Sequence, residues 1–360
     1  PGSPFNTNAL IDLQLNLNNT NYFDAVTLDI RKDEAVDQRI PVVVHTQPRK
    51  RRRFNAGLGY GTDTGPRVTA GIESRRVNQS GHRYRVHTHA STVESSLQFE
   101  YDIPIKDVTK DRWRLYAEVQ KGDVGDANAK QYSIGASRED DWGRLRRLLF
   151  MNAEQTSFSF GDEPSEDATV IYPGMTLSYD RLDDPQFVRK GFSVSATILG
   201  GSEALGSSTS FGSVMLTGRT VFPLGPRGRL LGAVSAGVVE AEEFLALPPS
   251  RRLFLGGDRS VRGYGYQTIS PENAAGDDIG GSRSLALSIE ADYQIAGAWG
   301  VAAFVDAGDV SDSSPTDFRT GIGLGMRYRS PVGMIRLDLA HPLDDPDTNV
   351  RVHLSIGADL

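Results

Sequence analysis

Hydrophobic and polar residues alternate along most of the chain, beginning after its N-terminal stretch. Apolar side chains recur at every second position within segments of about ten residues, and turn residues separate these segments. In the last segment, Val350, Val352 and Leu354 share one face, and Arg351 and His353 share the other. This period of two predicts β-strands that each have one apolar and one polar face.

Sixteen such segments follow one another. They cover residues 53–61, 66–75, 82–92, 94–102, 111–121, 130–139, 144–158, 168–181, 189–200, 209–222, 228–238, 283–294, 299–307, 318–329, 332–341 and 350–358. A soluble sandwich would show the same alternation, because its sheets also have one wet and one apolar face. Sixteen strands in one phase, with no second domain to cover the apolar faces, favour an all-β transmembrane barrel of sixteen antiparallel strands.

The connections between the predicted strands alternate in character. One set is often short, as at 223–227 and 296–298, and the other includes 122–129 and the long stretch 239–282. Short periplasmic turns and longer outer loops are typical of bacterial barrels. With the N-terminal part in the periplasm, residues 239–282 become the sixth extracellular loop of a barrel domain that spans residues 51–360.

Residues 1–50 follow a different pattern. The leucines between positions 10 and 17 suit a short amphipathic helix, and extended stretches follow at 26–31 and 40–46. A helix and a hairpin make up only part of a small α+β domain. We therefore expect earlier residues of the native protein to be missing, with residues 1–4 a remnant of processing or truncation.

Composition excludes several classes of protein. No apolar run approaches the ~18–20 residues that a membrane helix needs, and the absence of cysteine excludes a disulfide scaffold or a thiolate metal site. The formal net charge of −7 argues against a general polyanion binder, so we expect no nucleic-acid partner. The basic run 49–53 stands just before the first strand. Its place suggests either a periplasmic rim that faces phospholipid phosphates or a solvated linker.

Catalytic and metal-binding motifs are not found in the sequence. It has no Gly-x-Ser-x-Gly elbow, no Walker loop and no His-Glu-x-x-His helix. His87 and His89 share a strand face with Arg83 and Arg85, without a third ligand, so a polar lumen wall is expected there. We therefore predict a protein that is not an enzyme and uses no cofactor and no metal.

The stretch Leu255–Tyr264, with its Val-Arg-Gly-Tyr core, resembles the sixth-loop motif of the BamA/TamA superfamily of outer-membrane insertases. Three further matches follow in the right order: Glu290 within 285–293, the Phe-Val-Asp-Ala-Gly stretch 304–308, and the glycine-rich stretch 321–327. The N-terminal region resembles the last part of a POTRA domain, the periplasmic module of this superfamily. The resemblance implies a sixteen-stranded barrel preceded by a partial POTRA domain at residues 1–50.

Arg262 is the first candidate site residue, with Gly263 and Tyr264 beside it. The resemblance implies that this loop tip folds back into the lumen. The alternation places Glu290 on a polar face, as it does Asp306 together with Phe304. A guanidinium offers a planar fork that matches carboxylates, so these acids could tether the loop. The alternative is a solvated arginine that pairs with nothing.

Two sets of glycines are further candidates. Gly321, Gly323 and Gly325 fall on lumen-facing positions, where missing side chains would let loop six approach the strand closely. A nucleotide-binding loop is a poor alternative, since no Gly-Lys-Ser/Thr follows. The first and last strands carry inward-facing or terminal glycines, and in the superfamily this junction is the proposed lateral gate. They are Gly57, Gly59 and Gly357. An ordinary closed junction with glycines chosen for curvature remains the alternative.

The resemblance implies a function in protein assembly. The compact barrel and an ending without an aromatic residue are more similar to the TamA branch than to BamA. That branch implies an insertase in the outer membrane of a Gram-negative bacterium, with outer-membrane and autotransporter-type clients, outer-membrane lipids and a TamB-like inner-membrane-anchored protein as partners. A two-partner-secretion pore and a BamA-type insertase of the same superfamily are the alternatives. A passive porin or an outer-membrane enzyme would come from other classes.

Overall fold

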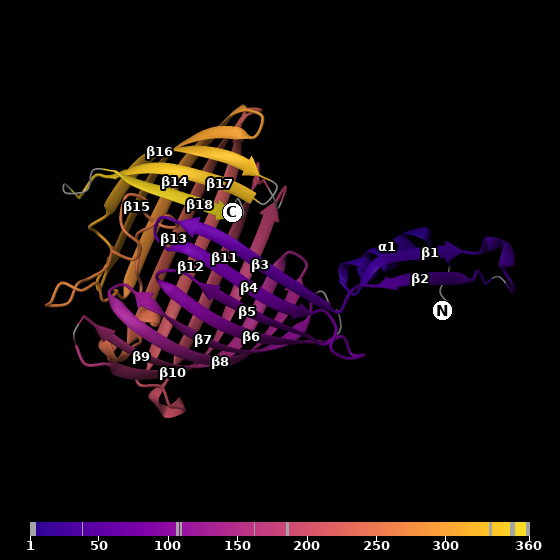
Figure 1. Cartoon of the computed structure of the whole chain (residues 1–360), viewed down its shortest axis with the longest axis horizontal. Coiled ribbons are helices and arrows are strands. Elements are labelled where there is room, and N and C mark those ends of the chain that lie inside the picture. The colour runs from indigo at the N-terminus through magenta and orange to yellow at the C-terminus, as the bar shows by residue number, and fades with distance from the viewer. Residues whose placement is uncertain are drawn as a thin grey trace.

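The computed structural model describes residues 5–37, 39–105, 108, 110–161, 163–184, 187–330, 333–345 and 350–357. A small N-terminal unit extends from one end of a large β-barrel (Figure 1). Among the described residues, no helix combines the length and hydrophobicity needed to cross a bilayer. The two parts correspond to the two patterns in the sequence.

The N-terminal unit is one helix packed beside a hairpin. Its elements are α1 (Thr7–Asn19), β1 (Phe23–Ile30), the 3-10 turn η1 (Lys32–Glu34) and β2 (Val42–Pro48), with β1 and β2 antiparallel. The side chain of Asn6 caps α1 by accepting from the backbone of Asn8 and Ala9. Gln14 donates from its side chain to the carbonyl of Val26 over 2.8 Å, which fixes the helix against the hairpin. The predicted helix followed by a hairpin is confirmed.

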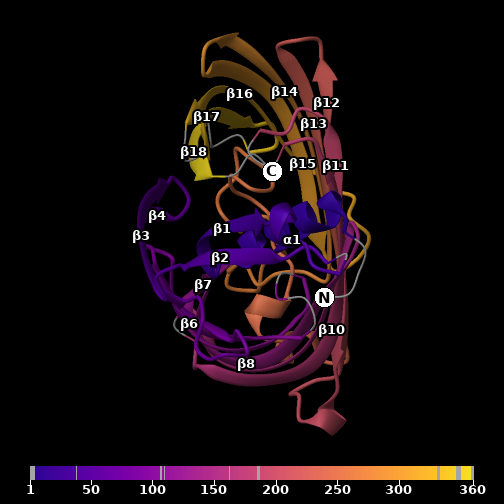
Figure 2. The same ribbon diagram turned by 90° about the vertical axis from the view of Figure 1, so that its right-hand side faces the viewer.

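Sixteen further strands form one antiparallel sheet in which each strand pairs with its neighbours in sequence. They are β3 (Arg52–Gly61), β4 (Gly65–Ser74), β5 (Arg83–Ala90), β6 (Glu94–Pro104), β7 (Arg112–Val124), β8 (Ala127–Trp142), β9 (Leu145–Phe160), β10 (Glu166–Leu182), β11 (Gly191–Gly201), β12 (Phe211–Leu224), β13 (Gly228–Ala241), β14 (Arg283–Ala296), β15 (Trp299–Ser311), β16 (Arg319–Ser330), β17 (Gly333–Pro342) and β18 (Arg351–Gly357). The sheet curls into a barrel (Figure 2), and the predicted fold class is confirmed.

The side chains of these strands alternate between exterior and lumen. On β16, Ile322, Leu324 and Met326 are exposed on the outside, while Arg327 is buried. On β3, Leu58 is 87% exposed, on the face opposite Gly57. An apolar exterior around a polar interior is the pattern that a bilayer selects in a barrel.

Strand lengths vary more than the sequence suggested. β8, β9 and β10 have 16, 16 and 17 residues, whereas β18 has 7. The expected outer loop at 122–129 is wrong, because β7 and β8 run to a two-residue turn at Gly125 and Asp126. Gly125 has a φ of 57°, which glycine adopts without steric cost. The wall of the barrel is therefore tall at β8–β10 and low at β18.

The connection between β13 and β14, residues 242–282, is called loop six here. It contains the short turns η3 (Phe244–Ala246) and η4 (Pro249–Arg251), and it lies inside the barrel (Figure 2). Leu247, Val261 and Tyr264 of the loop belong to one buried apolar cluster with Tyr172 and other strand residues. Arg252 donates to loop carbonyls, including that of Leu247, and its burial lowers its pKa to about 10. Loop six therefore shares a packed apolar core with the barrel wall.

Candidate functional site

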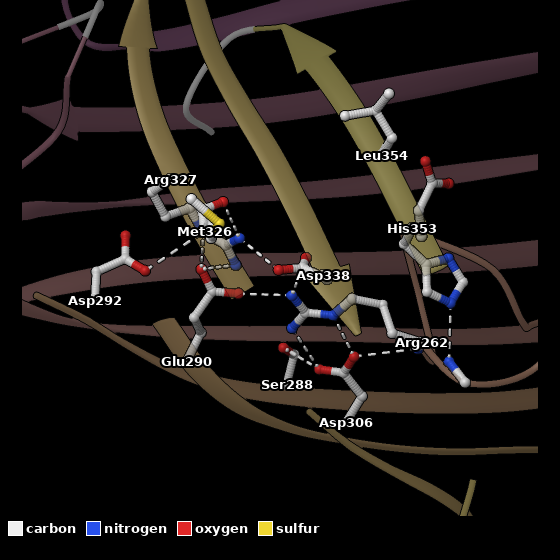
Figure 3. Close-up of polar contacts among 12 residues, drawn as sticks. Arg262, Ser288, Glu290, Asp292, Asp306, Met326, Arg327, Asp338, His353 and Leu354 are labelled. Carbon is white, nitrogen blue, oxygen red and sulfur yellow. Dashed lines mark hydrogen bonds and ion pairs between the residues drawn. The ribbon is translucent and has the colours of Figure 1, made fainter. Parts of the chain in front are cut away.

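Arg262 at the tip of loop six is 7% exposed and faces the lumen side of β15 (Figure 3). Its Nε donates to Oδ2 of Asp306 over 2.7 Å, and its Nη2 donates to Oδ1 over 3.0 Å. The backbone N–H of Arg262 donates to the same carboxylate over 3.1 Å. This is a bidentate pair with a third, backbone contact, so it fixes both the side chain and the loop backbone.

Two further carboxylates and an aromatic ring complete the surroundings of Arg262. Its Nη1 donates to Glu290 over 2.7 Å and to Asp338 over 3.0 Å. The guanidinium carbon lies 3.4 Å from the ring centroid of Phe304, a cation–π contact. Every nitrogen of the guanidinium thus has a partner. The carboxylates and the ring come from β14, β15 and β17, and β16 lies between β15 and β17.

A second arginine links these acids to one another. Arg327 of β16 donates to Glu290 over 2.8 Å from Nη2, and it also donates to Asp338. Asp292, next to Glu290 on the lumen face of β14, is bound by Arg229 over 2.7 Å. Three buried arginines therefore face four buried carboxylates, and Arg262 is the one that comes from a loop.

The partners of Arg262 stabilise its charged form. Burial opposes the charged form, but the hydrogen bonds and attraction of Asp306, with the charges of Glu290 and Asp338, raise the pKa of Arg262. A buried pair of this kind contributes little over an apolar replacement, but removing one partner leaves an uncompensated charge at a high cost. The site therefore fixes the position of loop six more than it adds to the overall stability of the barrel.

The glycines of β16 give this site its space. A Cβ on Gly321 would lie 1.8 Å from the carbonyl oxygen of Arg262, so loop backbone and strand backbone touch there. A Cβ on Gly323 would lie 2.3 Å from the ring of Phe304, and one on Gly325 would lie 1.9 Å from Asp338. Of the three, Gly321 makes room for loop six itself, whereas all three glycines were expected to do so. The other two make room for side chains that contact Arg262 or Arg327.

Gly263 and Tyr264 bind the last strands of the barrel. Gly263 has a φ of 102°, and its N–H donates to Nε2 of His353 on β18 over 3.1 Å. The hydroxyl of Tyr264 donates to the carbonyl of Thr320 over 3.3 Å. The loop tip therefore contacts β18 as well as β16.

The first and last strands meet without a backbone ladder, and this junction is called the seam here. Among the described residues, no β-pairing joins β3 to β18, while all other neighbouring barrel strands are paired. In the part of the chain that the structure describes, a hydrogen bond crosses the seam from the N–H of Leu354 to the hydroxyl of Thr62 over 3.3 Å. Gly57 and Gly59 lie on β3, and Gly357 ends β18. The barrel is thus nearly closed, with an unsealed seam.

Loop six also spans the seam. The N–H of Asp258 donates to Asp63, in the turn after β3, over 2.8 Å. Nδ1 of His353, on the other side of the seam, lies 3.7 Å from the same Asp63 carboxylate. Burial, together with the neighbouring Asp63, raises the pKa of Asp258. Two stretches of loop six, at Asp258 and Gly263, therefore contact the two sides of the seam.

The sequence placed Arg262 beside Glu290, Asp306 and Phe304, and the structure brings all four together. Sequence reasoning missed Asp338, Arg327 and His353. Arg327 lies in the glycine-rich stretch 321–327. Asp338 lies on the next strand, where the alternation places it on the lumen face. His353 had no local signal beyond its polar face. Within the described residues, no three His, Cys, Asp or Glu side chains form a group suited to a metal ion.

Comparison with known families agrees with this geometry. The Omp85 superfamily domain matches residues 46–359. The chain belongs to the Omp85 superfamily. It is therefore an outer-membrane β-barrel and not an enzyme. The outer membrane protein assembly factor BamA of Nitratidesulfovibrio vulgaris (strain Hildenborough) is 24% identical over 349 residues, or 91% of this chain and 44% of that protein. The chain thus spans less than half the length of this relative.

Solved structures of this Omp85 barrel's relatives show the same fold. BamA from Haemophilus ducreyi lacking POTRA domains 1–3 matches with a TM-score of 0.85 at 15% identity, over 99% of this chain and 79% of that one. CdiB from Acinetobacter baumannii matches with a TM-score of 0.62 at 15% identity, over 94% and 66%. CdiB from Escherichia coli gives 0.60 at 14% identity, over 98% and 70%. At these identities the likeness extends to the fold alone.

Proposed function

We propose that this chain is the barrel part of an outer-membrane protein assembly factor, which helps client β-barrels fold and insert. The observation that carries the proposal is the unsealed seam between β3 and β18, in a sheet whose other neighbours are all paired. An unpaired strand edge is a template for β-addition. A client strand would pair transiently with β3, and no bond chemistry is involved.

The site at Arg262 has a defined role in this proposal. Loop six, held by Arg262 against Glu290 and Asp306, occupies the lumen and leaves the seam as the route for clients. Its contacts with Asp63 and His353 would set how readily the two edges separate. The tether, the seam glycines and the loop-packing glycines are thus parts of one gating device.

A pair of introduced cysteines tests the proposal, because the chain has none of its own. We would join Thr62→Cys to Leu354→Cys across the seam and measure the folding of a client barrel into vesicles that contain the chain. Crosslinking should abolish the acceleration, and reduction should restore it. The matched control joins Leu337→Cys to Leu354→Cys, which are partners on the paired strands β17 and β18. Full acceleration with a fully crosslinked seam would contradict the proposal.

Finer assignments belong to the same proposal. The N-terminal unit, residues 1–50, is proposed to be the last part of a POTRA domain, and the similarity to BamA supports an insertase. The TamA-like branch, its autotransporter-type clients and a TamB-like partner rest on the sequence resemblance alone. Binding between the purified chain and a TamB-like protein would test them, and no binding would favour a BamA-type insertase.

A two-partner-secretion pore is the second candidate. The fold similarity to CdiB from two bacteria supports it. Such a pore passes its client through the lumen, in which loop six packs against the wall in this chain. Single-channel recordings discriminate the two functions, since a large and steady conductance would favour secretion.

A further inference from the structure

All three tryptophans of the chain lie at one end of the barrel. Trp113 lies at the start of β7, Trp142 is the last residue of β8, and Trp299 is the first residue of β15. Each is 45–59% exposed and lies on the same strand face as exposed aliphatic residues of the exterior, such as Leu115 on β7. This is the end that carries the N-terminal unit, and therefore the periplasmic end. Tryptophan is enriched where a membrane meets water, so this ring of indoles marks the interface.

Exposed basic side chains surround the same end. The start of β3 and every second connection from β4–β5 to β12–β13 contribute at least one exposed lysine or arginine that forms no ion pair within the described residues. One residue from each of these six places represents the set, called the basic collar here: Arg52, Arg76, Lys110, Arg144, Lys190 and Arg227. Arginines also stack on the indoles, Arg147 over Trp142 at 4.3 Å and Arg138 over Trp113 at 6.0 Å.

The opposite end of the barrel carries exposed acids. Exposed acids occupy its connections and strand ends: Asp123, Glu163, Glu203, Glu242, Asp312 and Asp317. The whole chain has a net charge of −7, so the collar runs against the overall balance. At the collar end, Asp183 accepts backbone N–H groups, including that of Arg189 over 3.0 Å, and among the described residues its carboxylate forms no ion pair with a basic side chain. The collar therefore gathers basic side chains without ion pairs at one end of the barrel.

We propose that the basic collar binds the phosphodiester headgroups of anionic phospholipids in the periplasmic leaflet. Tryptophans on the exterior place the collar at headgroup depth, and cations close to a bilayer attract anionic lipids over about a Debye length. A guanidinium binds a phosphate oxygen pair through two parallel N–H bonds. This inference does not depend on the assembly function, because it concerns the lipid that surrounds the barrel.

The tryptophans supply a label-free test. The full chain is folded into phosphatidylcholine vesicles that contain the same small fraction of either brominated phosphatidylglycerol or brominated phosphatidylcholine, and indole quenching is measured. We expect the anionic lipid to quench at least about two-fold more, since one basic side chain near a bilayer can enrich anionic lipid about five-fold. The difference should shrink as sodium chloride is raised. Equal quenching by the two lipids at low salt would overturn the proposal.

Charge-matched variants locate the effect. Replacing the six collar residues by glutamine should remove the excess quenching. Replacing six basic residues towards the other end, the half-buried Arg67 and the exposed Lys121, Lys130, Arg259, Arg319 and Arg351, changes the net charge equally and should leave it intact. An equal loss in both variants would overturn the collar as the site. Inorganic phosphate is added to the wild type at constant ionic strength. Competition beyond that of chloride would indicate a site for free phosphate rather than for lipid.

Discussion

At the scale of single residues, Arg262 decides where loop six lies. Its guanidinium and backbone together make five hydrogen bonds to Asp306, Glu290 and Asp338. Lysine would bring the same charge, but its ammonium cannot satisfy three carboxylates in one plane. The geometry, more than the charge, therefore makes arginine necessary here.

Replacing Arg262 by alanine should destabilise the barrel by about 3–5 kcal/mol, because three buried carboxylates lose their shared partner. Replacement by lysine should cost less. Urea unfolding of the chain in vesicles measures both, and Arg319→Ala is the control, since its pair with Asp317 is exposed and contributes about 0–1 kcal/mol. An R262A loss no greater than that of R319A would refute the interpretation that buried Arg262 fixes loop six.

Gly321 offers a steric test of the same contact. An alanine there would collide with the carbonyl of Arg262, and overpacking of this kind costs about 1–3 kcal/mol. Trypsin should then cleave after Arg262 at least about five-fold faster, as mass spectrometry of the fragments would show. Gly212→Ala on β12 is the control, because nothing lies within 4 Å of its added Cβ. Equal cleavage rates in the two variants would count against close loop packing.

The sequence predicted part of this site well. The motif at Arg262 and the strand alternation at Glu290 and Asp306 were enough to predict that these residues lie together. Asp338 and His353 were missed because they come from later strands. Strand tilt and barrel closure determine which lumen-facing residues lie at the same height in the barrel. Local periodicity does not carry that information.

At the scale of elements, the seam and loop six form one unit. The β3 side of the seam is linked through Asp63 to Asp258, and the β18 side is linked through His353 to Gly263. Direct bonding across the seam is sparse by comparison. The loop tip, more than the strand edges, therefore holds the seam together at its outer end.

Removing His353 should loosen that link. In His353→Ala the buried N–H of Gly263 loses its acceptor, which costs about 1–3 kcal/mol. Oxidative crosslinking between Thr62→Cys and Leu354→Cys should then slow, because the edges spend less time together. His353→Gln keeps an acceptor and should lie closer to the wild type. Alanine and glutamine variants that both crosslink at the wild-type rate would show that His353 does not position the seam.

At the scale of the whole molecule, a period of two along the chain predicted sixteen strands and their order. It did not predict strand length. Strands β8–β10 continue beyond the expected ends because Ala127, Phe158 and Ala168 pack in a cluster that Ile279 of loop six joins. That contact depends on a fold of loop six which no local pattern encodes, and the two-residue turn at Gly125 was missed for the same reason.

Loop six should also limit what the barrel lumen conducts. We expect only small, brief currents from the intact chain in a planar bilayer, because the loop packs against several walls of the lumen. Replacing residues 244–280 by a short Gly-Ser linker should produce a large, steady pore. Asp306 and Glu154 would be replaced by amides in the same variant, because the deletion removes their partners Arg262 and Arg251, while Glu290 and Asp338 keep Arg327.

A deletion within residues 313–317, between β15 and β16, is the matched control. It shortens an outer loop but leaves the contacts of Arg262 in place, so its currents should resemble those of the intact chain. A large, steady conductance from the intact chain would mean that loop six does not block the lumen. In that case the lumen, and not the seam, becomes the route for a client, and the secretion pore becomes the better proposal.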